Sequence, residues 1–289
     1  MRVRCFVGAF YRPNRRTVTI TVVRWVIGDI HGMLRPLQAL LDAIHKADAS
    51  PALLFVGDFV NRGPDSSGVV DLLLTLNGAR FCRGNHDDIF DIILHNRSSA
   101  GPADAVPVFA WFMNHGLDRT LESYGADYAM MEQVARRPSP QRIKELVDAV
   151  PDAHRAFFRS LPMTIEDPDL FIVHARWDAA DRDDQPDIAT RLHTDHRLHH
   201  RVLWERFDEF EIAATKVWKR RGFFGHTPVI NYGRPDLHAP VVAKQMVLLD
   251  TGAALSPLGR LTAWCAEDDR YIQVDHFARP VPAAAGGRG

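Results

Sequence analysis

The sequence V-V-R-W-V-I-G-D-I-H-G, residues 22–32, decides how the rest of the chain is interpreted. Its first six residues contain Val, Ile and Trp in an alternating pattern, which is typical of a β-strand. Gly28 and Gly32 follow, and glycine permits tight turns where a strand ends. Asp29 and His31 are then expected at the carboxyl end of a strand, where open α/β sheets place their ligand sites. A carboxylate and an imidazole in one crevice suit a divalent metal ion.

The bulk properties of the chain are those of a globular protein. Its 289 residues suffice for one large α/β domain or two small ones, and 46% hydrophobic with 25% charged residues is ordinary. The formal net charge of −1 provides no field that would attract nucleic acid, so we expect none as a partner. We expect no membrane partner either, because no apolar run approaches the ~18 residues of a membrane span. Cys5, Cys82 and Cys265 lie far apart, which disfavours a disulfide framework and indicates the reducing cytoplasm.

The two ends of the chain differ from its middle. Six arginines precede the first acidic residue, Asp29, but no apolar run or small-residue cleavage site accompanies them. We therefore interpret residues 1–21 as a basic N-terminal extension or an edge strand. Residues 278–289 are rich in Pro, Ala and Gly, which predicts a disordered tail. Residues 22–277 remain as one folded domain.

Between residues 34 and 82 the hydrophobic period switches repeatedly between that of a helix and that of a strand. The predicted elements are a helix over Leu34–Lys46, a strand over Ala52–Val56, a helix over Ser66–Leu76 and a strand over Ala79–Cys82. A polar loop follows each strand. This rhythm predicts parallel βαβ units with every loop at the same edge of the sheet.

The middle of the chain is predicted to be helical. We expect a helical insertion over about 96–160, with a loop at Asn96–Pro107 and a helix that begins at Ser139, a capping residue followed by Pro140. Leu170–Val173 is predicted as a strand. Asp178–His200 shows no clear period and is predicted to be a loop, its histidines solvated rather than metal-binding.

Short apolar runs return near the C-terminus. The predicted strands are Gly222–Phe224, Met246–Leu249, Arg260–Cys265 and Tyr271–Val274. Because these strands are short and closely spaced, we expect a second sheet that is more antiparallel than the first.

Five segments share one feature, an Asp, Asn or His beside a turn at the end of an apolar strand. They are G-D-I-H-G at 28–32, G-D-F-V-N-R-G at 57–63, G-N-H-D at 84–87, V-H-A-R at 173–176 and G-H-T-P at 225–228. Each one alone would be interpreted as an ordinary turn. Together, in this order, they predict a metal centre.

This combination resembles the calcineurin-like metallophosphoesterase superfamily, and within it the bacterial serine/threonine phosphoprotein phosphatase type. The ending L-L-D-T-G-A with G-R-L-T-A-W, residues 248–253 and 259–264, is also similar to that family. The resemblance implies an α/β (α+β) fold in which two mixed β-sheets pack as a sandwich flanked by helices. It also implies that residues 22–277 form the catalytic domain.

The resemblance assigns six metal ligands. Asp29 and His31 would bind a first ion, Asn85, His174 and His226 a second, and Asp58 would bridge the two. Two divalent ions that share a bridging hydroxide can direct its attack on a phosphoryl group and neutralise the charge that develops. Mixed oxygen and nitrogen ligands favour manganese, our first choice, or iron or zinc.

The resemblance also suggests residues that act on the substrate. His86 would be the general acid, because imidazole titrates near neutral pH, and Arg62 would bind the phosphate. Arg206 resembles a second phosphate-binding arginine, although an exposed helix residue is an equally good interpretation. Arg83 is predicted to be structural, paired with an acid beneath the loop.

Two positions depart from the family pattern. Asn61 stands where the pattern G-D-x-V-D-R-G has an aspartate that orients the general acid. An amide accepts a hydrogen bond but brings no charge, so we expect a weaker acid role for His86 or a shifted pH profile. Arg176 stands where protein phosphatases have a small residue, and it could contact phosphate or block part of the groove.

These observations predict a binuclear metal-dependent enzyme that hydrolyses phosphomonoesters. The substrate would be a phosphorylated protein, as in serine/threonine phosphatases, or a small phosphoester. G-N-H-D at 84–87 and G-P-D-S at 63–66 also resemble diadenosine-tetraphosphatase-like and nucleic-acid end-healing relatives, which gives an alternative substrate class. A second alternative is a metal-binding scaffold without turnover, and Asn61 is its only support.

Overall fold

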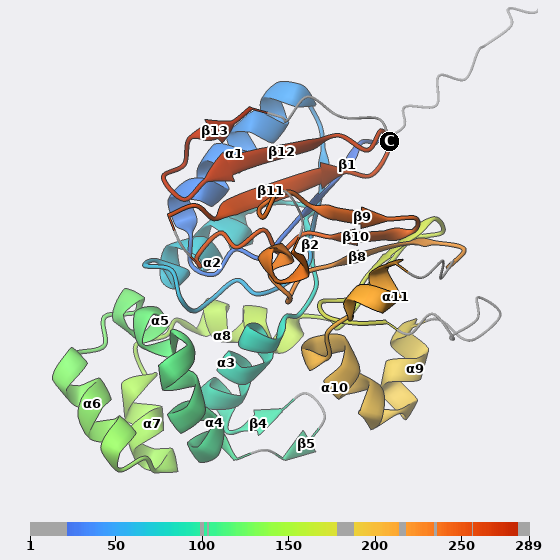
Figure 1. Ribbon diagram of the computed structural model, residues 1–289. Helices are drawn as coiled ribbons and strands as arrows, with labels where there is room; N and C mark the ends of the chain where they lie inside the picture. Colours follow the sequence, from blue (N-terminus) through green and yellow to red (C-terminus); the bar gives the residue numbers. More distant parts are fainter. Residues whose placement is uncertain are drawn as a thin grey trace, which may run out of the picture.

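Two β-sheets that pack against each other form the centre of the protein (Figure 1). The computed structural model describes residues 22–98, 101–102, 104–177, 188–213, 218–233, 236–255 and 257–282. The predicted basic extension, residues 1–21, lies outside the described residues. Among the residues that the structure describes, no helix has the length and apolar character needed to cross a membrane.

The first sheet has six strands and is mixed. In spatial order they are β13 (Pro280–Val281), β12 (Tyr271–Asp275), β11 (Arg260–Cys265), β1 (Arg24–Ile27), β2 (Ala52–Phe55) and β3 (Arg80–Phe81). The predicted βαβ units are confirmed, because β1, β2 and β3 are parallel and are joined by α1 (Leu34–Ala47) and α2 (Ser66–Thr75). These three strands therefore end at one edge of the sheet.

The second sheet has five strands. In spatial order they are β6 (Ile165–Glu166), β7 (Leu170–Ile172), β8 (Arg221–Phe224), β10 (Met246–Leu248) and β9 (Val241–Ala243). Alternate residues of the two sheets meet in one buried layer, in which Val26 and Leu54 of the first sheet pack with Ile172 and Phe223 of the second. The predicted sandwich of two mixed sheets is confirmed.

The prediction that all late strands build the second sheet is wrong for two of them. β11 pairs antiparallel with β1, where Trp25 lies opposite Cys265, and β12 pairs with β11. The alternation of side chains shows that a segment is a strand but carries no information about its neighbour. The predicted disordered tail also begins too early, since Pro280–Val281 forms β13, while residues 283–289 lie outside the described residues.

A helical region covers one side of the sandwich, over the part of the chain where the sequence predicts a helical insertion (Figure 1). It contains α3 (Asn85–His95), the short hairpin β4 (Arg97–Ser98) and β5 (Gly101–Pro102), α4 (Ala105–Phe112), the 3-10 helix η1 (Met113–His115), α5 (Leu117–Ser123), α6 (Tyr128–Arg136), α7 (Pro140–Leu146) and α8 (Asp152–Ser160). Ser139 caps α7 as predicted, because its hydroxyl accepts a hydrogen bond from the Arg142 backbone N–H. The predicted loop at Asn96–Pro107 instead contains the hairpin and the first turn of α4.

The loop predicted at Asp178–His200 is wrong over its described part. Residues 188–213 form α9 (Ile188–Thr194), α10 (His196–Trp204) and α11 (Glu209–Ala213), which cover the outer face of the second sheet. Ile188 and Leu192 have the spacing of one helix face and are buried. Asp195 separates α9 from α10, and its side chain caps α10 by accepting from the backbone N–H of Arg197. The helical period of hydrophobic residues is therefore interrupted at Asp195, and for this reason the sequence showed no clear period. Residues 178–187 lie outside the described residues.

Candidate active site

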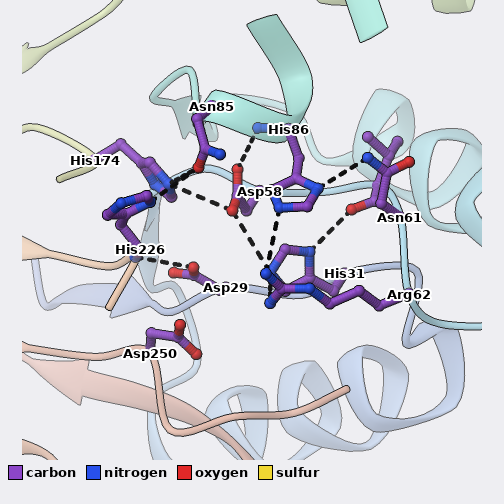
Figure 2. A network of polar contacts seen from close by, with 12 residues as sticks. Asp29, His31, Asp58, Asn61, Arg62, Asn85, His86, His174, His226 and Asp250 are labelled. Carbon is purple, nitrogen blue, oxygen red and sulfur yellow. Dashed lines mark hydrogen bonds and ion pairs between the residues drawn. The ribbon is translucent and has the colours of Figure 1, made fainter. Parts of the chain in front are cut away.

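The six predicted metal ligands converge at the carboxyl ends of strands from both sheets (Figure 2). Asp29 and His31 follow β1, Asp58 follows β2, His174 follows β7 and His226 follows β8, while Asn85 begins α3. All are buried except His226, which is half-buried. Side chains that are up to 197 residues apart in the sequence therefore share one site.

The backbone at this site is unusual. Among the described residues other than glycine, His31, Asp58 and His226 have φ values of 48°, 55° and 66°, and Asn61 and Arg62 have values of 71° and 70°. This left-handed conformation is costly for residues that carry a Cβ atom, and it concentrates where the surrounding structure enforces a functional geometry. Nothing in the sequence pattern indicated it.

The two glycines of the opening stretch have different roles. Gly32 has a φ of 66° and turns the chain, as predicted. Gly28 is required for space, because a Cβ atom there would lie 2.2 Å from the carbonyl oxygen of Leu249. This close approach joins the end of β1 to the second sheet.

One ring nitrogen of each predicted histidine ligand is held by a backbone carbonyl. The contacts are His31 Nδ1 with Val60 O (2.9 Å), His174 Nδ1 with Val56 O (3.0 Å) and His226 Nε2 with Trp204 O (3.0 Å). Because a carbonyl only accepts hydrogen bonds, the nitrogen that faces it carries the proton. The other nitrogen of each ring points toward the centre, where it would bind a cation when it carries no proton.

These inward-pointing nitrogens meet oxygen atoms at the centre. His174 Nε2 lies 3.3 Å from Asp58 Oδ2, and His31 Nε2 lies 3.5 Å from the same oxygen. His174 Nε2 and His226 Nδ1 each lie 3.0 Å from Asn85 Oδ1. Asp58 is thus placed between the two groups of ligands, the position that the sequence predicts for a bridge.

Two groups of three side chains bring their ligand atoms within 4.8 Å of one another. They are His31 with Asp58 and His86, and Asp29 with Asp58 and His174. Asp58 belongs to both groups, which agrees with two ions that share it. The first group contains His86 in the place that the sequence analysis gave to Asp29.

Asp29 itself supports a cation. Its Oδ2 accepts a hydrogen bond from the backbone N–H of His226 at 2.9 Å, but its buried Oδ1 has no hydrogen-bond partner among the described residues. Gly225 leaves space beside this oxygen, since a Cβ atom there would lie 2.0 Å from Oδ1. A buried carboxylate oxygen without a donor is costly unless a cation binds it. The residues present therefore fit a centre of two divalent ions.

The pKa values at the centre are strongly perturbed. Burial, with the Asp250 carboxylate nearby, raises the pKa of Asp29 well above its usual value. Burial also acts to raise the pKa of Asp58, but His174 and His86 hold it well below its usual value. Burial acts to lower the pKa of His174, but Asp58 raises it to about 10. A divalent cation would take the place of the proton on His174.

Asp250 is a site residue that the sequence analysis missed (Figure 2). It is buried beside Asp29, and it raises the pKa of that carboxyl. Its Oδ1 accepts from the backbone N–H of Gly252 at 3.0 Å, while Oδ2 has no hydrogen-bond partner among the described residues. The signal was present, since Asp250 follows an apolar strand and precedes a glycine turn.

His86 lies beside Asn61 rather than a carboxylate. Asn61 Nδ2 is 2.8 Å from His86 Nδ1, and the hydroxyl of Thr120 donates to Asn61 Oδ1 at 2.8 Å. This second bond fixes the amide with its nitrogen toward the ring, so Asn61 donates to His86 Nδ1, and the other ring nitrogen, Nε2, faces a second donor, Arg62 Nη2. Burial, which acts together with the charge of Arg62, lowers the pKa of His86 to about 3. Thr120, in α5, was not predicted from the sequence.

Arg62 points into the centre. Its Nη1 lies 2.7 Å from His31 Nε2 and its Nη2 lies 3.3 Å from His86 Nε2. The guanidinium therefore lies between a predicted ligand and the predicted acid, where a phosphate that bridges them would be within reach.

The other predicted arginines differ in their surroundings. Arg206 is exposed and follows α10, and its charge contributes to the low pKa of His226, about 3, which is caused mainly by burial. Arg176 Nη2 donates to Glu211 Oε1 at 2.6 Å, which ties the end of β7 to α11. Arg83 is buried and bonds Asp88 and Asp91 at 3.1 Å each, which confirms its predicted structural role.

The histidines of residues 193–200 form no ligand group among the described residues. His199 Nε2 bonds the carbonyl oxygen of Leu192 at 2.7 Å, within the α9–α10 unit. The His200 side chain is 72% exposed. They belong to helices rather than to the predicted loop.

Comparison with known proteins agrees with this geometry. A family model described as calcineurin-like phosphoesterase matches residues 23–229, more than half of the chain. A symmetrical bis(5'-nucleosyl)-tetraphosphatase of Pseudomonas putida (strain GB-1) is 33% identical over 112 residues, which cover 35% of this chain and 39% of that protein. The protein with the same description in Coxiella burnetii (strain RSA 493 / Nine Mile phase I) is 44% identical over 63 residues, 22% of each chain.

A solved structure shares the fold. The crystal structure of a putative diadenosine tetraphosphatase superposes with a TM-score of 0.50 at 22% identity, over 89% of this chain and 95% of that one. The curated relatives match over less than two-fifths of their length, so their activities are not transferred by similarity alone. Because the family model matches more than half of its residues, the chain belongs to the calcineurin-like phosphoesterase family and is a metal-dependent hydrolase that acts on phosphate esters.

Proposed function

We propose that this hydrolase cleaves dinucleoside polyphosphates, such as diadenosine tetraphosphate, and releases nucleotides. Water adds to one phosphorus atom, the P–O bond of the anhydride breaks, and the leaving nucleotide departs as a phosphate anion. The observation that carries this proposal is the 2.8 Å contact between Asn61 Nδ2 and His86 Nδ1.

This contact bears on the leaving group. A serine side chain leaves as a strongly basic alkoxide and requires a full proton, which an imidazolium paired with a carboxylate can supply. Asn61 instead donates to Nδ1 and brings no charge that would stabilise an imidazolium. When a substrate phosphate draws the Arg62 guanidinium away from Nε2, a neutral His86 would present the N–H of that nitrogen. A neutral N–H is a hydrogen-bond donor, and this is sufficient help for a phosphate anion, which is a much weaker base. The missing carboxylate is therefore suited to an anhydride substrate.

The remaining residues have complementary roles. Asp29, His31, Asp58, Asn85, His174 and His226 would hold two divalent ions, which supply charge neutralisation and an activated nucleophile. Arg62 binds the phosphoryl oxygens from the side of His31 and His86. Arg206, exposed near His226, can reach a second phosphate of a polyphosphate chain. We infer manganese as the ion, because the ligands combine carboxylate, amide and imidazole.

The named relatives support the same substrate class. Both proteins described above are called symmetrical bis(5'-nucleosyl)-tetraphosphatases. The aligned region covers 22% of the Coxiella burnetii protein and 39% of the Pseudomonas putida protein. Symmetrical cleavage of diadenosine tetraphosphate would produce two molecules of ADP.

The test compares diadenosine tetraphosphate with a phosphoserine peptide, each with added Mn²⁺ and with a chelator. We expect kcat/KM for the dinucleotide to exceed that for the peptide at least 100-fold, with ADP as the product and full loss on chelation. The Asp58→Asn variant, which removes the predicted bridge, should be inactive on both substrates and serves as the matched negative control. A preference for the peptide would overturn the proposal.

Protein serine/threonine phosphatase activity, the first expectation from the sequence, is the second candidate. One observation favours it, because His86 Nε2 lies 3.3 Å from Arg62 Nη2, so the predicted acid stands beside the predicted phosphate-binding arginine, where the leaving oxygen of a phosphoserine would be within reach. A preference for the phosphoserine peptide would support this candidate. Absence of metal-dependent hydrolysis of either substrate, or of p-nitrophenyl phosphate, would instead indicate a non-catalytic metal-binding scaffold.

A further inference from the structure

A group of aromatic side chains lies beside the metal centre and is not used by the chemistry described above. Trp111 and Phe112 end α4, His115 lies in η1, and Trp204 ends α10. The ring centroids of Trp111 and Trp204 are 5.5 Å apart with an interplanar angle of 31°. Trp111 also contacts Phe112 at 5.1 Å and His115 at 4.9 Å in edge-to-face geometry.

Two contacts join this aromatic group to the centre. The carbonyl oxygen of Trp204 accepts the hydrogen bond from His226 Nε2 at 3.0 Å. The ring of Phe112 lies 5.0 Å from the ring of His86. Trp111 is therefore separated from both a predicted ligand and the predicted acid by a single intervening side chain.

Trp111 is held firmly yet remains accessible. Its side chain is 48% exposed, whereas Phe112 next to it is 1% exposed. Contacts with Trp204, Phe112 and His115 restrict the orientation of the indole, so a planar ligand would meet a surface that is already in place. Pre-ordered aromatic surfaces bind at low entropic cost.

We propose that the exposed surface of Trp111 stacks with a nucleobase of the substrate, with Trp204 as its support. This inference rests on the proposed action on dinucleoside polyphosphates. With one base on Trp111, the phosphate chain extends toward Arg62, and Arg206 follows Trp204 closely enough to contact the same chain. Every nucleobase has a π-face, so stacking predicts similar use of adenine and guanine substrates.

The kinetic test removes the indole and compares substrates with and without a base. In Trp111→Leu, which keeps apolar packing on Phe112, we expect KM for diadenosine tetraphosphate to rise roughly tenfold or more. We expect kcat to change little, and hydrolysis of inorganic tripolyphosphate, which has no base, to be unchanged. Trp111→Phe keeps a smaller aromatic ring, so its KM for diadenosine tetraphosphate should lie between those of the wild type and Trp111→Leu. Tyr128→Ala removes another exposed aromatic, from α6, and is the matched control.

A binding test does not depend on turnover. ADP, added with a chelator, should quench the fluorescence of the wild-type protein and not that of Trp111→Leu, whereas ribose 5-phosphate should quench neither. An unchanged KM in Trp111→Leu, or equal quenching of both proteins by ADP, would overturn the inference. If the wild-type protein fails to hydrolyse diadenosine tetraphosphate but ADP still quenches through Trp111, the proposed function falls and the base-binding site stands.

Discussion

The carbonyl oxygen of Gly116 accepts a hydrogen bond from the backbone N–H of Arg62 at 3.2 Å. Gly116 has a φ of 89°, and a Cβ atom there would lie 2.3 Å from the Arg62 nitrogen. The helical insertion thus holds the loop that carries Asn61 and Arg62, and Thr120 reinforces this hold from α5.

The first prediction concerns this contact. Gly116→Ala should displace the loop and lower kcat/KM by at least tenfold, because its new Cβ collides with the Arg62 backbone. Gly125→Ala is the control, since Gly125 has a similar φ of 87° but nothing within 4 Å of its Cβ position. Both variants should lose about 1–2 kcal/mol of stability from backbone strain, as measured by chemical denaturation, and Gly116→Ala should lose more because of its collision. Equal activity of the two variants would show that the contact with Arg62 does not matter.

The second prediction concerns Asn61. In Asn61→Asp a carboxylate faces His86 Nδ1 and stabilises the imidazolium, so the pKa of His86 should rise from its low wild-type value of about 3. The protonated acid is present only below its pKa. At low pH, kcat of Asn61→Asp for a phosphoserine peptide should therefore exceed that of the wild type, and it should decrease as the pH increases through the new pKa. Hydrolysis of diadenosine tetraphosphate should change less. If neither kcat nor its pH dependence changes for either substrate, Asn61 does not set the behaviour of His86.

The third prediction concerns metal affinity. Gly225→Ala would bring a Cβ atom within 2.0 Å of Asp29 Oδ1 and displace this predicted ligand. We expect Mn²⁺ affinity, measured by calorimetry, to fall about 10- to 100-fold. Gly222→Ala, in the strand β8 that precedes Gly225, would instead meet the rings of Phe171 and Phe224 at 2.7 Å, so it should lower stability and leave Mn²⁺ affinity unchanged. Retention of full affinity in Gly225→Ala would argue against Asp29 as a ligand.

The fourth prediction concerns the buried ion pairs of Arg83. Arg83→Met leaves the carboxylates of Asp88 and Asp91 without their buried partner, although Arg159 remains 3.3 Å from Asp91. We expect the free energy of unfolding to fall by about 3–5 kcal/mol. Arg119→Met breaks only an exposed pair with Glu122 and should cost less than about 1 kcal/mol. A similar loss in both variants would contradict the structural role of Arg83.

The fifth prediction concerns stability at acidic pH. The hydrogen bond from Arg24 lowers the pKa of Asp169 below its usual value of 3.8. A lowered pKa stabilises the fold above the unfolded value, and this stabilisation is lost as the pH falls through the folded value. The wild type should therefore lose about 0.2–1 kcal/mol more than Asp169→Asn below about pH 4, a small amount because Asp169 is largely exposed. This variant keeps the ion pairs of Arg24 with Asp167 and Glu267. High salt should reduce the difference, and an equal loss without salt would exclude this ion pair as its source.

The sequence predicted the strand ends and their polar residues well, because each lies within one short apolar run followed by a glycine turn. Contacts between residues that are far apart in the sequence could not be predicted from it. Thr120 reaches Asn61 from a helix that is 59 residues away, and Trp111 meets Trp204 only once α4 and α10 are packed. The antiparallel pairing of β11 with β1 was likewise missed, because partner choice depends on how the whole chain packs.

The hydrogen bond from the backbone of His226 to Asp29 joins residues 197 positions apart. A ribosome adds about 5–20 residues per second, so roughly 10–40 s separate the synthesis of the two. During that interval the nascent chain carries Asp29, His31 and Asp58 without the residues that complete the centre. Assembly of the complete set of predicted ligands is therefore possible only after residue 226 has been made, and a shorter nascent chain lacks a ligand that the centre needs.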